Sequence, residues 1–141
     1  NEARTLALLP IQNQTFNAGL ETDLSEQLNL LLRANSSVKI APSGIADLQL
    51  NITLLNLKTS SSGLSNEQIS SGVKAIIQGQ AILEDRRTGR KVWEESALEV
   101  KLTESVENET NSVSSFSLSG SIRELIKLFA LKIYERLFTT F

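Results

Sequence analysis

The chain has 141 residues, of which 40% are hydrophobic and 21% are charged, and its formal net charge is −2 at pH 7. This balance is ordinary for a globular protein, so we expect one domain over residues 1–141. Cysteine, histidine and methionine are absent, which excludes thiol nucleophiles, histidine bases and thiolate or imidazole metal sites. Carboxylate-only chemistry or a hard-cation site stays possible, although no acidic cluster has calcium-loop spacing. Because no paired carboxylates or nucleophile stand at a telling spacing, we expect no enzyme, no metal and no cofactor. The net charge gives no reason to expect nucleic acid binding.

The first third of the chain predicts a strand, a helix and a second strand. Residues 4–11 form a compact apolar run, typical of a strand buried on both faces. Leucines then recur every three or four residues over 18–34, which indicates a one-faced helix with Asn17 as its N-cap. A short strand follows at 38–41. Because one helix separates these two strands, we expect them to lie parallel.

The middle of the chain predicts long strands. Apolar and polar residues alternate from Ala46, and the phase slips after Leu54, which indicates a bulge. A long hairpin should run through 73–83 and 92–102, with Gly89 supplying a positive φ at the turn. The Ser-rich segments 59–71 and 104–119 are interpreted as connections.

A second helix should close the chain, because Ser121 and Glu124 have capping-box spacing and an apolar stripe runs to Leu137. The fold class is therefore α+β, in the order β-α-β-β-β-β-α. Both helices would pack on one face of a mixed, mainly antiparallel sheet of four to five strands that contains the long hairpin. The other sheet face should be polar, with Gln49, Asn51, Thr53, Lys74, Gln78 and Gln80.

Several segments together resemble the LptE-type lipopolysaccharide-assembly lipoproteins. These are LALLPIQNQTF at 6–16, GLE at 19–21, ADLQL at 46–50, DRRTGRKVW at 85–93 and IYERL at 133–137. The resemblance implies a non-enzymatic protein that plugs an LptD-type outer-membrane β-barrel, helps it assemble and assists lipopolysaccharide delivery to the outer leaflet. It also implies a lipid anchor on the periplasmic side of the outer membrane, on a cysteine upstream of Asn1.

Four basic residues crowd the predicted hairpin tip: Arg86, Arg87, Arg90 and Lys91. They are candidates for binding lipid A phosphates, because guanidinium groups grip phosphate bidentately. Acidic neighbours at 84, 85, 94 and 95 offset their charge, which favours a simple solvated turn as the alternative.

Candidate partner contacts are Trp93, Leu128, Leu131 and Phe138. Trp93 is out of phase with the apolar residues that follow it, so it either anchors a partner or packs in the core beyond a local bulge. The other three fall beside the main stripe of the last helix, where they can serve either the core or a docking surface.

A different periplasmic lipoprotein of similar fold is the alternative function, for example a CsgG-like component of a secretion channel. A plug acts as one copy per barrel, whereas a ring component self-associates, so assembly state distinguishes the two.

Overall fold

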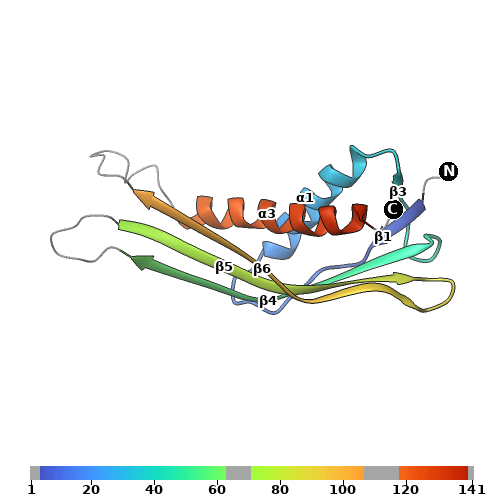
Figure 1. Ribbon diagram of the computed structural model, residues 1–141, viewed down its shortest axis with the longest axis horizontal. Coiled ribbons are helices and arrows are strands. Elements are labelled where there is room, and N and C mark those ends of the chain that lie inside the picture. Colours follow the sequence, from blue (N-terminus) through green and yellow to red (C-terminus); the bar gives the residue numbers. More distant parts are fainter. Residues whose placement is uncertain (1–3, 63–70, 107–117, 140–141) are drawn as a thin grey trace.

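The long hairpin is the central feature of the computed structural model, which describes residues 4–62, 71–106 and 118–139. Its arms are β5 (Ser71–Asp85) and β6 (Lys91–Val106), each about 50 Å long at the usual rise per strand residue. Gly89 has φ 75°, and its amide donates to the Asp85 carbonyl oxygen at 2.8 Å, which closes the predicted turn. The equally long β4 (Leu48–Ser62) pairs antiparallel with β5, so three long strands run side by side (Figure 1).

Short parallel strands complete the sheet. β1 (Arg4–Leu8) lies between β3 (Val38–Ile40) and β4 and is parallel to both, which confirms the predicted crossover. The two-residue β2 (Gln12–Asn13) pairs with the middle of β4. The described strands therefore form one six-stranded mixed sheet, in the order β3-β1-β4-β5-β6 with β2 beside β4.

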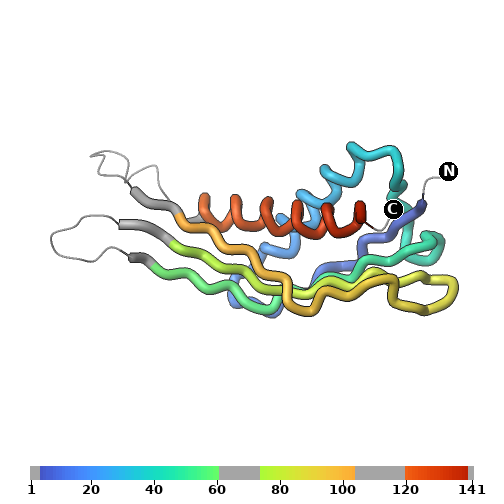
Figure 2. The backbone as a smooth tube through the Cα atoms, viewed as in Figure 1, coloured from blue at the N-terminus to red at the C-terminus, as the bar shows by residue number. Residues whose placement is uncertain are grey.

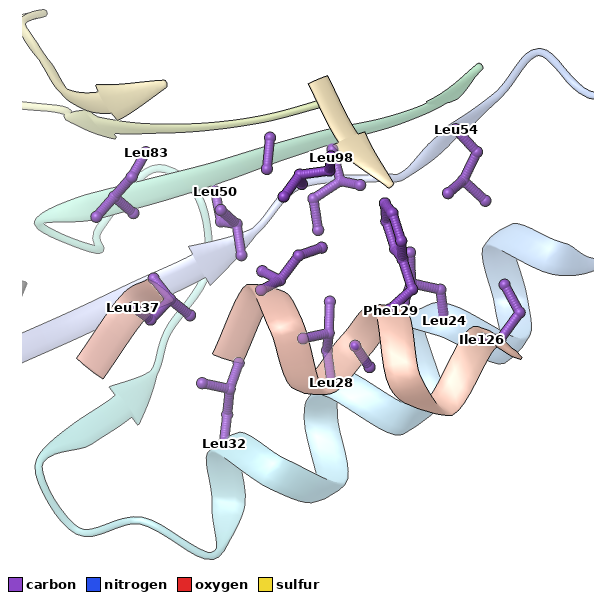
Figure 3. Packing of buried hydrophobic residues seen from close by; sticks show 14 of the residues in the cluster. Leu24, Leu28, Leu32, Leu50, Leu54, Leu83, Leu98, Ile126, Phe129 and Leu137 are labelled. Atoms are coloured by element: carbon purple, nitrogen blue, oxygen red, sulfur yellow. The ribbon is translucent and has the colours of Figure 1, made fainter. Parts of the chain in front are cut away.

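Both helices lie on the same side of this sheet, as predicted (Figure 1). α1 (Leu20–Arg33) and α3 (Leu118–Phe138) bury apolar stripes against each other and against the sheet, and Figure 3 shows these side chains meeting in one core. Leu24, Leu28, Leu32, Phe129 and Leu137 are at most 1% exposed. Burying one such side chain contributes about 1.5–3 kcal/mol, so this stack of residues holds the helices on the sheet.

Two bulges bend the long strands at the same level. The register shifts between Leu54 and Asn56 on β4, which confirms the predicted bulge there. It shifts again on β6, where the partners of Gly79 and Ala81 are Leu98 and Glu95. The tube in Figure 2 shows the three strands curving together beneath the helices. The bulges therefore give the sheet a concave side, which the helices fill.

The face of the sheet away from the helices is mainly polar. Gln49, Asn51 and Thr53 alternate with buried neighbours on β4, and Lys74, Gln78 and Gln80 do so on β5. Ile76 and Ile82 are half-buried on the same face and interrupt it. The prediction of a polar sheet face is therefore correct for the six residues named in it.

Both predicted helix starts are wrong. The N-cap of α1 is Gly19 rather than Asn17, because Gly19 adopts the left-handed conformation at φ 95° and turns the chain into the helix. α3 begins at Leu118, so Ser121 lies inside it and is 2% exposed rather than acting as a cap.

The predicted Ser-rich connections are shorter than expected. β4 continues to Ser62 and β5 begins at Ser71, while β6 continues to Val106. The rest of both segments, residues 63–70 and 107–117, lies outside the described residues.

Gly79 is a position where we expect a small substitution to destabilise the fold. A Cβ atom there would lie 2.6 Å from the Thr53 carbonyl oxygen and 3.0 Å from Cζ of Phe129. We expect Gly79→Ala to lower the free energy of unfolding by about 1–3 kcal/mol in urea denaturation. The control, Gly44→Ala, meets nothing within 4 Å and should stay within about 0.5 kcal/mol of the wild type. Equal stability of both variants would contradict this account of the packing.

Candidate functional site

The hairpin tip is tied to the loop that precedes β4. The Arg86 amide donates to the Asp47 carbonyl oxygen at 2.9 Å, and Arg86 Nε donates to the Ala46 carbonyl oxygen at 2.7 Å. Ala46 is fully buried. Arg86 therefore fixes the tip to the body of the domain through its amide and one guanidinium N–H.

The other three basic residues of the tip differ in how far their charges are compensated. Arg87 Nε lies 3.9 Å from a carboxylate oxygen of Asp47 and also of Asp85, and Lys91 Nζ lies 3.0 Å from Glu94 Oε1. Among the residues that the structure describes, Arg90 has no salt bridge. The side chains of Arg87 and Lys91 are 63% and 53% exposed. Ion pairs this exposed are weak, so all three cations can turn to a ligand.

Trp93 packs in the core beyond the bulge on β6. Of the two interpretations of the sequence, partner anchor or core residue, the structure supports the core residue. It is 6% exposed and is paired with Leu83 across the hairpin. The Arg136 guanidinium lies 4.8 Å from its ring centroid and also donates through Nε to Glu95 at 2.8 Å. The indole Nε1 is buried and has no hydrogen-bond partner in the described chain. The partner role of Trp93 stays a prediction.

Two of the remaining candidate contacts come together in a groove. Leu128 and Leu131 project from α3 toward the outer edge of β6, and Leu131 is 39% exposed. The groove has a volume of about 390 Å³ and is also lined by Glu99, Val100, Lys101, Lys132 and Glu135. Phe138 instead lies edge-to-face on Tyr134, with ring centroids 4.4 Å apart. Only Leu128 and Leu131 of the predicted partner set thus share a surface.

The sequence prediction missed a polar network at the entrance to α1. The Asn13 Oδ1 atom accepts from the amide and the hydroxyl of Thr15, at 2.9 and 2.6 Å. Its Nδ2 donates to the Asn17 carbonyl oxygen and to Glu21 Oε1, both at 2.8 Å. The hydrogen bond from Asn13 lowers the pKa of Glu21. This network replaces the expected Asn17 cap, and the Asn-x-Thr segment that precedes Gly19-Leu20-Glu21 was the sequence signal for it.

The described residues contain no group of three or more acidic, histidine or cysteine side chains that could hold a metal ion. Over the same residues, no helix is both long and apolar enough to cross a membrane. The hairpin tip, the groove beside α3 and the polar sheet face are the candidate surfaces for binding.

These surfaces belong to a small α+β domain. The sequence pattern of the lipopolysaccharide-assembly family LptE matches residues 3–137, which is nearly the whole chain. The protein belongs to this family. No curated protein matches the chain.

Solved structures of bacterial proteins, among them two lipoproteins, share the fold. A minor lipoprotein from Acinetobacter baumannii superposes with a TM-score of 0.58 at 19% identity, covering 95% of this chain and 91% of that one. The rare lipoprotein B from Shewanella oneidensis gives 0.53 at 16% identity, with 96% and 95% covered. A PelC dodecamer from Paraburkholderia phytofirmans gives 0.53 at 18% identity, with 90% and 86% covered. At these identities the likeness concerns the fold.

Trp93 is the only tryptophan, so its fluorescence reports this part of the core. We expect iodide to quench it weakly in the native protein, because the ring is buried beneath Arg136. Arg136→Ala should increase the quenching and shift the emission to longer wavelength. Lys132 is an exposed residue on the same helix, and Lys132→Ala should change neither the quenching nor the emission wavelength. Strong quenching of the wild type would contradict the core position.

Proposed function

We propose that this protein is a lipopolysaccharide-assembly subunit that occupies the lumen of an LptD-type outer-membrane β-barrel. In this role it helps the barrel to assemble and assists delivery of lipopolysaccharide to the outer leaflet. The observation that carries the proposal is membership of the LptE family over residues 3–137. We further propose that the mature protein is lipid-anchored on the periplasmic side of the outer membrane.

The polarity of the surface supports enclosure by a barrel. Large barrels have polar interiors, so a domain that fills one needs a wet surface toward the wall. Besides the exposed Lys58, Lys74 and Lys101, the open sheet face carries a row of neutral amide and hydroxyl side chains along β4 and β5, which includes Asn51 and Gln78. Such neutral groups can replace hydrogen bonds to water with hydrogen bonds to the barrel wall. They avoid the desolvation penalty that an unpaired charge would carry.

The hairpin tip supports contact with the glycolipid. Arg87, Arg90 and Lys91 present exposed cations on a turn that Arg86 holds against the domain. Phosphate groups accept strong charge-assisted hydrogen bonds from such side chains. The tip thus carries three exposed positive charges on a turn that is hydrogen-bonded to the domain, an arrangement suited to bind the lipid A phosphates.

The first test is co-purification. When the full-length precursor is produced together with an LptD-type barrel, we expect a complex that contains one copy of each protein, measured by native mass spectrometry. One plug fills the lumen of one barrel, so the expected ratio of the two proteins is one to one. Failure to bind the barrel would overturn the proposal.

The PelC dodecamer, which shares the fold, gives a reason to keep one alternative. If this chain is instead a ring-forming component of a secretion channel, the purified protein should form a closed oligomer of many copies without any barrel.

The second test concerns the tip. We expect the triple variant Arg87→Gln, Arg90→Gln and Lys91→Gln to bind lipopolysaccharide at least about tenfold more weakly, because three charge-assisted contacts are lost. Arg86 is kept, since it stabilises the loop. The matched control replaces three exposed lysines away from the tip, Lys58, Lys74 and Lys127, with glutamine. Equal loss in both triple variants would show that only overall charge matters.

A further inference from the structure

The outer edge of β6 has backbone groups that no other described strand satisfies. β6 is the last strand of the sheet, and beyond its bulge the segment from Leu98 pairs with β5 without interruption. Lys132 Nζ donates to the Glu99 carbonyl oxygen at 3.2 Å, so this carbonyl points away from β5. Backbone groups alternate in direction along a strand. Glu99 and Lys101 therefore direct their amides and carbonyls outward, and Val100 directs its own inward.

The side chains along this edge are self-complementary. Glu99 and Lys101 lie opposite Gln78 and Ile76, on the open face of the sheet. Val100 lies opposite the buried Ile77, on the face that α3 covers. An antiparallel copy of the same segment, centred on Val100, would place Glu99 opposite a lysine and Lys101 opposite a glutamate.

We propose that the β6 edge pairs antiparallel with the same edge of a second copy of this chain, about a two-fold axis beside Val100. Two equivalent Glu99–Lys101 ion pairs then form on the open face, and the outward backbone groups of both residues become paired. The contact is isologous, so it closes at two copies.

Charge selects this register over its neighbours. Moving the axis by one residue to Glu99 would place the two glutamates opposite each other, and moving it to Lys101 would do the same to the two lysines. Like charges at directly opposed positions destabilise a strand pair. Only the register centred on Val100 gives opposite charges at both positions within the regular segment.

The groove beside α3 supplies the apolar part of the contact. Leu128 and Leu131 line it above the β6 edge, and Leu131 is 39% exposed. A second copy that extends the sheet at this edge brings its own Val100 beneath these leucines and covers them. The pairing requires Lys132 to release the Glu99 carbonyl, and this exposed lysine gives up only a solvent-accessible bond.

A single-cysteine variant tests the axis, because the wild-type chain contains no cysteine. Val100 would form a non-hydrogen-bonded pair with itself, in which Cα atoms lie about 4.5 Å apart, within disulfide range. We expect Val100→Cys to form a disulfide-linked dimer under mild oxidation. The control is Val92→Cys on the same strand, where Val92 is 41% exposed in the wild type. The two copies of residue 92 do not face each other across the axis, so this variant should form no disulfide-linked dimer.

Charge reversal tests the register by analytical ultracentrifugation. We expect Lys101→Glu alone and Glu99→Lys alone to raise the dimer dissociation constant by about tenfold or more, and the double variant to restore it. Glu84→Lys, on the open face of the inner strand β5, is the matched control and should leave dimerisation unchanged.

The proposal is overturned if the wild type stays monomeric up to its solubility limit. It is also overturned if a dimer forms that neither Val100→Cys links nor Lys101→Glu weakens, because another surface then holds it. The proposed role in a barrel is tested separately by co-purification. Loss of dimerisation in the free chain and loss of barrel binding are therefore distinguishable.

Discussion

The packing of Phe129 on Gly79 is the constraint on which the rest of the structure depends. The ring is fully buried, and a Cβ at Gly79 would come within 3.0 Å of it. The two strand partners of Gly79 are Leu54 and Leu98, and each lies beside a bulge. The bend of the sheet, the absent side chain of Gly79 and the largest fully buried side chain of the described residues therefore coincide. This coincidence fixes where α3 lies along the long strands, and α1 is packed against α3.

A consequence of this arrangement is that the core uses one face of the sheet only. Function is left to surfaces that the core does not need: the open face, the hairpin tip and the outer edge of β6. Each is polar or charged, and each is attached to a rigid element. In the proposed role the protein meets a large partner and a glycolipid, and separate surfaces on one domain allow both contacts at once.

The basic tip shows how tertiary contacts redistribute charge. In the sequence, four basic residues look equivalent. In the structure, Arg86 is tied to backbone carbonyls near Ala46, while Arg90 has no salt bridge among the described residues. The groove is a similar case, because its two walls come from segments about 30 residues apart. Neither Glu99 nor Lys132 has a local pattern that indicates their contact.

The sequence by itself determined the order of the elements except β2, because two polar residues are too short a segment to show a strand pattern. Period-two alternation specified β4 and β5, the leucine spacing specified α1, and the phase slip after Leu54 specified a bulge, since all of these are local patterns. It misplaced the starts of both helices, because Asn13 reaches over from β2 and Ser121 is drawn into the core by packing. Only the tertiary structure decided that Trp93 lies under Arg136 and that Leu131 borders a free strand edge. These facts depend on contacts between residues far apart in the chain, and no local pattern encodes them.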